Sequence, residues 1–126
     1  MTVILPKNLT ALGSSVFYEC VRLVRIDLPS SLYSIGDAAF YLCQSLTSVR
    51  IPEGVESLGN YAFAGCFNLS SVSLPKSLVS IGNNIFYGDE NIALTVPKGS
   101  YAEEWAEENG ISLEREKLTP VQTEMI

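Results

Sequence analysis

Residues 32–54 read LYSIGDAAFYLCQSLTSVRIPEG, and residues 55–77 read VESLGNYAFAGCFNLSSVSLPKS. The two lines have the same length and carry the same residue types at the same places, and the agreement extends along most of the chain. Phenylalanine holds one place in every copy, as Phe17, Phe40, Phe63 and Phe86. Glycine holds another, as Gly13, Gly36, Gly59 and Gly82. This constant step of 23 residues predicts a protein built of stacked repeats.

The period divides the chain into coils at residues 9–31, 32–54, 55–77 and 78–99, with residues 1–8 forming the end of a coil whose beginning is missing. A single deletion between Ile92 and Leu94 explains why Pro97 comes one residue early. Segments such as Val24–Leu28 and Thr47–Ile51 alternate and are rich in β-branched residues, so each predicts a short strand that a proline ends.

Two further features of the repeat predict local structure. The glycine is expected where the coil bends, because a residue without Cβ adopts positive φ at little cost. The A-F-x-x-C stretch is too short for an α-helix and predicts a tight, 3₁₀-like turn. One such unit cannot bury its own apolar residues, whereas stacked units can. The predicted fold is therefore a solenoid of stacked coils, with parallel strands on one side and tight turns on another.

The end of the chain predicts a helical cap at about residues 101–109. Ser100 and Glu103 have the spacing of a capping box, and Gly110 suits the helix end. Tyr101, Ala102, Trp105 and Ala106 share one face of this helix, which should cover the last coil. We expect the repeat domain to span residues 1–111 and residues 112–126 to be a tail or linker.

Composition excludes several functions. The net charge is −6, and a nucleic-acid-binding protein needs a basic face instead. No apolar run has the length of a membrane span. The absence of histidine removes Ser-His-Asp catalysis and histidine metal sites. The sequence also offers no phosphate loop and no set of metal ligands, so we expect neither an enzyme nor a cofactor. The segment MTVILPKNLTALG lacks the pattern of a signal peptide, which leaves an intracellular protein or a piece of a longer one.

Cysteine follows the same period at Cys20, Cys43 and Cys66, and Asp89 takes the fourth place. We interpret the cysteines as buried, reduced thiols, because buried cysteine behaves as a small hydrophobic residue. A disulfide between neighbouring coils and a soft-metal site are the alternatives. The column disfavours both, because it holds the side chains parallel rather than converging.

Two surfaces are candidates for binding. The predicted strands present Arg25, Asp27, Ser48, Arg50, Ser71 and Ser73, and the first and last strands add Thr2, Ile4, Ala93 and Thr95. A cross-strand Asp27–Arg50 pair is expected there; otherwise the face is rich in small hydroxyl residues and could be merely solvated. The second surface is an aromatic strip of Tyr18, Tyr41 and Tyr87, with Ala64 completing the column. These tyrosines either bind a sugar or a protein, or only shield the turn below them.

The lines from SLYSIGDAAFYLCQSLTSVRIPEG to VESLGNYAFAGCFNLSSVSLPKS resemble BspA-like leucine-rich repeats, and VPKGSYAEEWAEENGI resembles the helix that closes many such arrays. The resemblance covers residues 1–111 and departs from the family at Asp89, at the deletion near Ala93 and at the incomplete first coil. It implies a right-handed leucine-rich-repeat solenoid with the parallel sheet on its concave face and short 3₁₀ or turn segments on its convex side. It also implies a secreted or cell-surface protein that binds other proteins, host matrix or neighbouring cells and is not an enzyme. We expect the ligand of such a binding or adhesion module to be a protein or a glycan.

A structural spacer that binds nothing is the alternative function. The incomplete first coil also predicts an exposed strand edge at Thr2–Leu5 and exposed apolar residues at Val16–Phe17, through which two chains could form an end-to-end homodimer. No metal, nucleic acid or membrane is expected as a partner of this segment.

Overall fold

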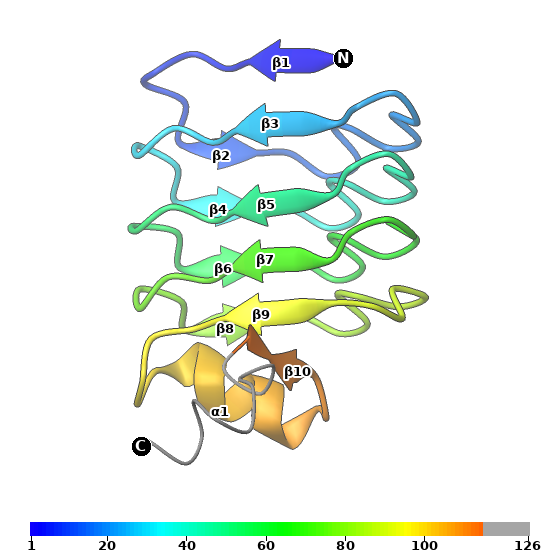
Figure 1. Ribbon diagram of the computed structural model, residues 1–126. Helices are drawn as coiled ribbons and strands as arrows, with labels where there is room; N and C mark the ends of the chain where they lie inside the picture. The colour runs from blue at the N-terminus through cyan, green and yellow to red at the C-terminus, as the bar shows by residue number, and fades with distance from the viewer. Residues whose placement is uncertain (115–126) are drawn as a thin grey trace.

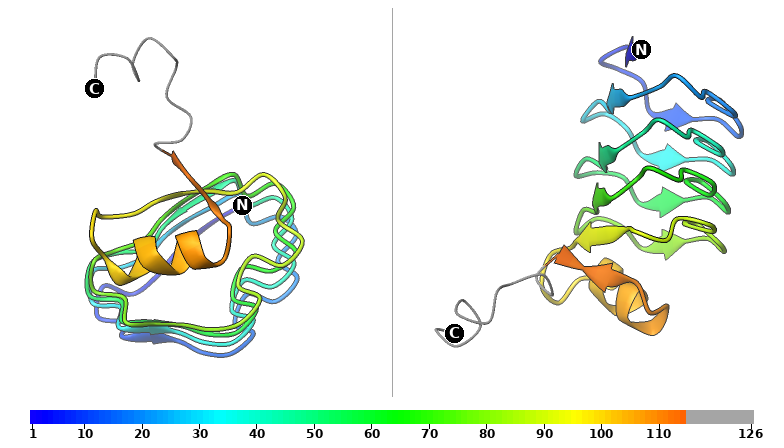
Figure 2. Two further views of the ribbon diagram at one scale, coloured as in Figure 1. Left: turned by 90° about the horizontal axis from the view of Figure 1, so that it is seen from below. Right: turned by 45° about the vertical axis from the view of Figure 1, so that its right-hand side comes forward.

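A computed structural model describes residues 1–114 and shows a solenoid of coils stacked along one axis (Figure 1). Viewed along that axis, the coils lie over one another and a helix crosses the end of the stack (Figure 2, left). One side carries β1 (Thr2–Ile4), β3 (Arg25–Asp27), β5 (Ser48–Arg50), β7 (Ser71–Ser73) and β9 (Ala93–Thr95). The other side carries β2 (Ala11–Leu12), β4 (Ser34–Ile35), β6 (Ser57–Leu58) and β8 (Ser80–Ile81). The predicted solenoid is confirmed.

All paired strands run parallel, and each residue lies opposite its equivalent in the next coil. Ser48 of β5, for example, pairs with Ser71 of β7. Ser71 then pairs with Ala93 of β9, one residue short of the regular step, as the predicted deletion requires. The strands predicted from β-branched alternation are therefore present, although they are shorter than the pattern suggested.

The sheet of β2, β4, β6 and β8 was not predicted from the sequence. Each of its strands has only two residues, such as Ser34–Ile35, which is too short to show an alternating pattern. These residues become strands only because a neighbouring coil lies at hydrogen-bonding distance, with Ile35 opposite Leu58. The stacking therefore creates this sheet, and local propensity does not.

The corner that holds the phenylalanine is a zigzag turn, which we call the turn corner: residues 13–20 and their equivalents 36–43, 59–66 and 82–89. Turn bonds between residues three apart are present, as in the 3.1 Å bond from Tyr18 N–H to the Ser15 carbonyl. In addition, alternate N–H groups donate to the following coil: Ser15 to Asp37, Phe17 to Ala39 and Glu19 to Tyr41, at 2.9, 2.8 and 2.7 Å. Ser15 and Glu19 adopt left-handed φ angles of 57° and 55°. The turn corner is thus a ladder between coils rather than a 3₁₀ helix.

The repeated glycines do not have the predicted role. Positive φ occurs at other positions, and Gly36 is not among them. A Cβ atom on Gly36 would lie 2.8 Å from the backbone nitrogen of Ser14, and one on Gly59 would collide with the backbone of Asp37. At Gly13, which has no described coil in front of it, nothing lies within 4 Å. Glycine is therefore required because neighbouring coils approach closely, and not because the backbone is left-handed.

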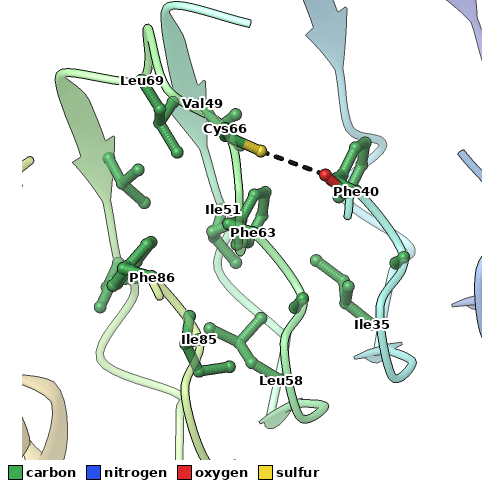
Figure 3. Packing of buried hydrophobic residues seen from close by; sticks show 14 of the residues in the cluster. Ile35, Phe40, Val49, Ile51, Leu58, Phe63, Cys66, Leu69, Ile85 and Phe86 are labelled. Carbon is green, nitrogen blue, oxygen red and sulfur yellow. Dashed lines mark hydrogen bonds between the residues drawn. The ribbon is translucent and has the colours of Figure 1, made fainter. Parts of the chain in front are cut away.

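The core consists of continuous columns of equivalent side chains (Figure 3). The phenylalanine rings stack with centroids 5.3 Å apart between Phe17 and Phe40, and 5.0 Å apart between Phe40 and Phe63. Phe86 continues the stack at 6.0 Å from Phe63. Phe40 and Phe63 are fully buried. Burying each such ring contributes about 1.5–3 kcal/mol relative to leaving it exposed, so the stack is a principal source of stability.

The helix α1 (Tyr101–Glu108) closes the C-terminal end of the stack (Figure 1). Ser100 caps it by accepting a bond from the Glu103 N–H at 3.1 Å, and the Glu103 side chain accepts from the Gly99 N–H at 3.0 Å. At the other end, Gly110 takes a left-handed φ of 67°, and the Ile111 N–H donates to the carbonyl of Ala106. The predicted start and end of the helix are confirmed.

The packing of the cap differs from the prediction in two ways. Ala102 is fully buried and Trp105 meets the Phe86 ring edge-on at 6.2 Å, but Tyr101 is exposed rather than on the buried face. The sheet also extends past the predicted end of the domain, because β10 (Ser112–Leu113) pairs with β9. Leu113 is buried. The remainder of the predicted tail, residues 115–126, lies outside the described residues.

At the opposite end, β1 pairs with β3 and forms the edge of its sheet within residues 1–114. Ile4 is 93% exposed and Val16 is 47% exposed, whereas Phe17 and Val3 are half-buried. The predicted exposure is therefore found at Val16 and Ile4 and is only partial at Phe17. No helix within residues 1–114 is long and apolar enough to span a membrane.

Candidate functional site

The tyrosines on the outside of the turn corner form one aromatic surface. Tyr18 and Tyr41 occupy equivalent places in adjacent coils, and their rings stack with centroids 5.3 Å apart and an interplanar angle of 13°. Tyr87 is 69% exposed in the last coil. In the coil between them the equivalent residue is Ala64, which is buried. The structure thus brings Tyr18 and Tyr41 into contact, as the predicted strip requires.

A fourth tyrosine, which sequence reasoning missed, fills the gap at Ala64. Tyr61 lies three residues earlier in the turn corner, and its ring meets that of Tyr41 edge-on at 6.2 Å. Its hydroxyl accepts a 3.2 Å hydrogen bond from the Asn84 amide. Tyr61 belongs to a different repeat position, so a search down one column could not find it. The sequence signal that could have found Tyr61 was its position in the same turn as Ala64, on the opposite side of Phe63.

Together these side chains define what we call the tyrosine face: Tyr18, Tyr41, Tyr61 and Tyr87. They surround a groove of about 530 Å³ whose floor includes Ala38. This volume falls within the usual range for ligand pockets. The negative charge of Glu19 raises the pKa of Tyr18, in the direction that favours the neutral phenol. The groove therefore combines apolar ring surface with hydroxyl groups that can pair with a ligand.

We call the exposed side of the strands β1, β3, β5, β7 and β9 the strand face, and it differs from the prediction. Asp27 contacts Arg25 on the same strand, at 3.5 Å, rather than Arg50 on the next strand. Both side chains are more than 70% exposed, so this ion pair contributes less than about 1 kcal/mol. The strands β3 and β5 are not joined by a ladder of backbone hydrogen bonds, which loosens the register that a cross-strand pair would need.

The other strand-face candidates are mostly polar and solvated. Ser48 and Arg50 are exposed, whereas Ser71 and Ser73 are half-buried. Ala93, which was expected to face solvent with them, is fully buried. Pairing of β10 with β9 explains this burial, because Ala93 lies opposite Ser112 of the cap strand. Arg50 and Ser73 line a hollow of about 310 Å³, together with Glu53, Pro75, Thr95 and Pro97.

The cysteine column lies inside the turn corners and is not a site. Cys43 and Cys66 are fully buried, and the Cys43 thiol donates to the Phe17 carbonyl at 3.1 Å. The Cys66 thiol donates to the Phe40 carbonyl at the same distance (Figure 3). The hydrogen bond to Cys43 and burial both raise the pKa of Cys66. Cys20 is only half-buried, since no coil covers it on one side. All three are free thiols, so the disulfide alternative is wrong. Residues 1–114 contain no group of three or more acidic or cysteine side chains that could hold a metal ion.

Asp89 holds the fourth place of this column. Its side chain is only 7% exposed, and neither carboxylate oxygen has a hydrogen-bond partner. Burial raises the pKa of Asp89 to about 8, and the nearby Cys66 N–H opposes this rise only in part. An unpaired buried carboxylate is costly, so this position is a weak point of the fold.

The comparisons with known proteins agree with this architecture. Residues 1–100 match the BspA type leucine-rich repeat region in six copies. The chain belongs to the BspA-type leucine-rich repeat family. A comparison with curated proteins finds no similar sequence.

Several solved structures of leucine-rich repeat proteins resemble this BspA-type solenoid. A leucine-rich repeat protein from Bacteroides ovatus is 32% identical with a TM-score of 0.75, covering 90% of this chain and 29% of that chain. A leucine-rich repeat protein of T. pallidum is 27% identical with a TM-score of 0.63, covering 75% and 57%. A leucine-rich cell surface protein from Faecalibacterium prausnitzii is 23% identical with a TM-score of 0.70, covering 90% and 35%. The chain thus spans less than two thirds of the length of each.

Proposed function

We propose that this solenoid is a non-enzymatic recognition module of a secreted or cell-surface protein, and that it binds a protein partner through its tyrosine face. Leucine-rich repeat proteins are typically protein-interaction modules. The likeness to a leucine-rich cell surface protein supports the proposed location. The observation that carries the proposal is the groove between Tyr18, Tyr41, Tyr61 and Tyr87.

The tyrosine face has the properties of a binding hot spot. Tyrosine is enriched at protein interfaces because it offers a large contact area and a hydroxyl at little entropic cost. The backbone beneath the rings is fixed, since the Glu19 N–H donates to the Tyr41 carbonyl at 2.7 Å and the Gly65 N–H to the Tyr87 carbonyl at 2.8 Å. Anchors that are already rigid lose little freedom when a partner binds.

The ring geometry favours a protein over a glycan. A sugar stacks on the open flat face of an aromatic ring, but Tyr18 and Tyr41 already stack on each other. Tyr61 meets Tyr41 with its edge. These three rings therefore offer mainly edges and hydroxyls, which suit the side chains and amides of a protein, and only Tyr87 of the tyrosine face lacks a ring partner within residues 1–114. The strand face offers Arg25 and Arg50 as charged contacts but has no aromatic anchor, so we place it second.

A binding screen with two matched tyrosine variants tests the proposal. The full chain is screened against extracellular proteins and against a glycan array, and each binder is measured again with Tyr41→Ala and with Tyr33→Ala. Tyr33 is 55% exposed but lies outside the tyrosine face. We expect a protein binder whose affinity falls at least about tenfold with Tyr41→Ala and is unchanged with Tyr33→Ala.

Other outcomes of the same screen contradict the proposal. Binding that is lost with Arg50→Ala and kept with Tyr41→Ala would move the site to the strand face. Binding to glycans alone would show that the ligand is a glycan and not a protein. The absence of binding in both screens would favour the alternative function, a structural spacer.

A further inference from the structure

The ladder of hydrogen bonds between turn corners ends in a row of donors at the C-terminal end of the stack. At the last internal junction, the N–H groups of Tyr61, Phe63 and Gly65 donate to carbonyls of the last coil at 3.0, 3.0 and 2.8 Å. The equivalent donors one coil later belong to Asn84, Phe86 and Gly88. Within residues 1–114 these three N–H groups find no acceptor. We call them the open row.

The cap leaves the open row accessible. The helix α1 crosses the interior of the last coil, and the turn corners lie outside its footprint (Figure 2, left). A cavity of about 300 Å³ separates the two, with Asn84, Phe86 and Asp89 on the coil side and Trp105, Asn109 and Ser112 on the cap side. The Trp105 ring lies over Phe86, so a further complete coil, including one from a second copy of this chain, cannot stack there. Asn84 and Phe86 of the open row line this cavity, and Gly88 is exposed beside it.

The chemistry of the missing acceptor follows from the junctions that are filled. In each of them the acceptors are main-chain carbonyls of alternate residues, such as Asp37, Ala39 and Tyr41. A row of N–H groups can also hold an anion. Here, however, the acidic residue Glu90 lines the cavity and no lysine or arginine does, which disfavours an anion. Neutral carbonyls fit both the donors and the surrounding charge.

We propose that the open row binds a segment of a partner polypeptide through its main-chain carbonyls, in the way that a peptide adds to the edge of a sheet. The segment carries an apolar residue, because Phe86, Ile92 and Trp105 give the cavity apolar walls. It carries a lysine or arginine beside that residue, which faces the acidic side chain of Glu90. This site uses backbone donors rather than tyrosine side chains, so it stands independently of the tyrosine face.

Hydrogen exchange in the free, full chain provides the first test. The amide protons of Asn84, Phe86 and Gly88, followed by NMR, should exchange at least about 100-fold faster than those of Tyr61 and Phe63, because exchange of a bonded amide requires opening of the structure. The two sets lie in equivalent turns, so each is the control for the other. Comparable protection of both sets would show that the open row is already occupied and would overturn the proposal.

Binding provides the second test, with a displayed library of random linear peptides selected on the full chain. We expect selected peptides to combine an apolar and a basic residue and to shift the amide signals of the open row most strongly. Replacing Phe86 by its α-hydroxy acid removes one N–H and keeps the side chain, and it should weaken binding about tenfold. The Tyr41→Ala variant should bind these peptides normally, which separates this site from the tyrosine face.

Four results would overturn the inference. Selected peptides could leave the open-row amides unshifted, or could bind the ester variant as tightly as the native chain. Inorganic phosphate could produce the same shifts at similar concentration, which would identify an anion site instead. Failure to select any peptide would also count against it.

Discussion

Replacing Asp89 by cysteine should stabilise the protein and remove part of its pH dependence. Cys43 and Cys66 each donate to a carbonyl of the preceding coil at 3.1 Å, and by the repeat the acceptor for position 89 is the Phe63 carbonyl. A carboxylate cannot make that bond. Burial raises the pKa of Asp89 to about 8 from an ordinary value of 3.8, so the folded protein favours the neutral acid.

The size of the effect follows from proton linkage. Because the folded-state pKa is raised, the stabilising contribution is complete below pH 4 and is lost as the pH rises through about 8. Each pH unit in that window corresponds to about 1.4 kcal/mol, for an upper limit of about 6 kcal/mol. Structural relaxation around a buried charge reduces this limit, and we expect about 2 kcal/mol.

Urea unfolding between pH 4 and pH 8, followed by Trp105 fluorescence, measures the effect. The unfolding free energy of the native chain should fall relative to that of Asp89→Cys as the pH rises, and the variant should be more stable by about 2 kcal/mol at pH 8. Glu90→Gln is the control, since that neighbouring acid is exposed and should leave the profile unchanged. If the unfolding free energies of the native chain and of Asp89→Cys changed with pH in parallel, the reasoning would be refuted.

Four further outcomes are expected. Gly59→Ala should destabilise the fold by about 1–3 kcal/mol, because its Cβ would strike the preceding coil, whereas Gly13→Ala should be tolerated; equal unfolding midpoints would contradict the close-approach argument. Trp105→Ala should cost about 3 kcal/mol, and native emission typical of solvated indole would show that the cap does not dock. Cys20 should react with a thiol reagent in the native state well before the two buried cysteines, and equal rates would contradict the column. An end-to-end dimer, if seen by light scattering, should dissociate with Ile4→Lys, and a monomer at high concentration would exclude it.

Sequence reasoning succeeded where one residue type recurs at one position. The spacing of Phe40 and Phe63 predicted the buried stack, and the early Pro97 located the deletion that pairs Ser71 with Ala93. These features could be predicted because coils stacked in register must place equivalent side chains over one another. The same logic predicted the contact of Tyr18 with Tyr41.

The remaining features depend on contacts between different repeat positions. Tyr61 joins the tyrosine face from another column, and Ala93 is buried by a cap strand that has no equivalent in the repeat. The role of Gly36 follows from the distance between coils, which the composition of a single coil does not reveal. The prediction of an Asp27–Arg50 pair was wrong, because an exposed side chain can pair with a nearer partner, which here is Arg25.

The one-way donation within the turn corners also gives that side of the stack an electrical direction. The peptide groups that join coils there all point their N–H toward the C-terminal end, as Phe17 does toward Ala39 and Phe40 toward Ala62. Aligned peptide dipoles add end to end, so their charges cancel inside the stack and a partial positive charge remains at its C-terminal end. That end is where the glutamates of α1 lie (Figure 1). Because the interior charges cancel, adding or removing coils would leave this terminal charge unchanged, and one acidic cap suits a stack of any length.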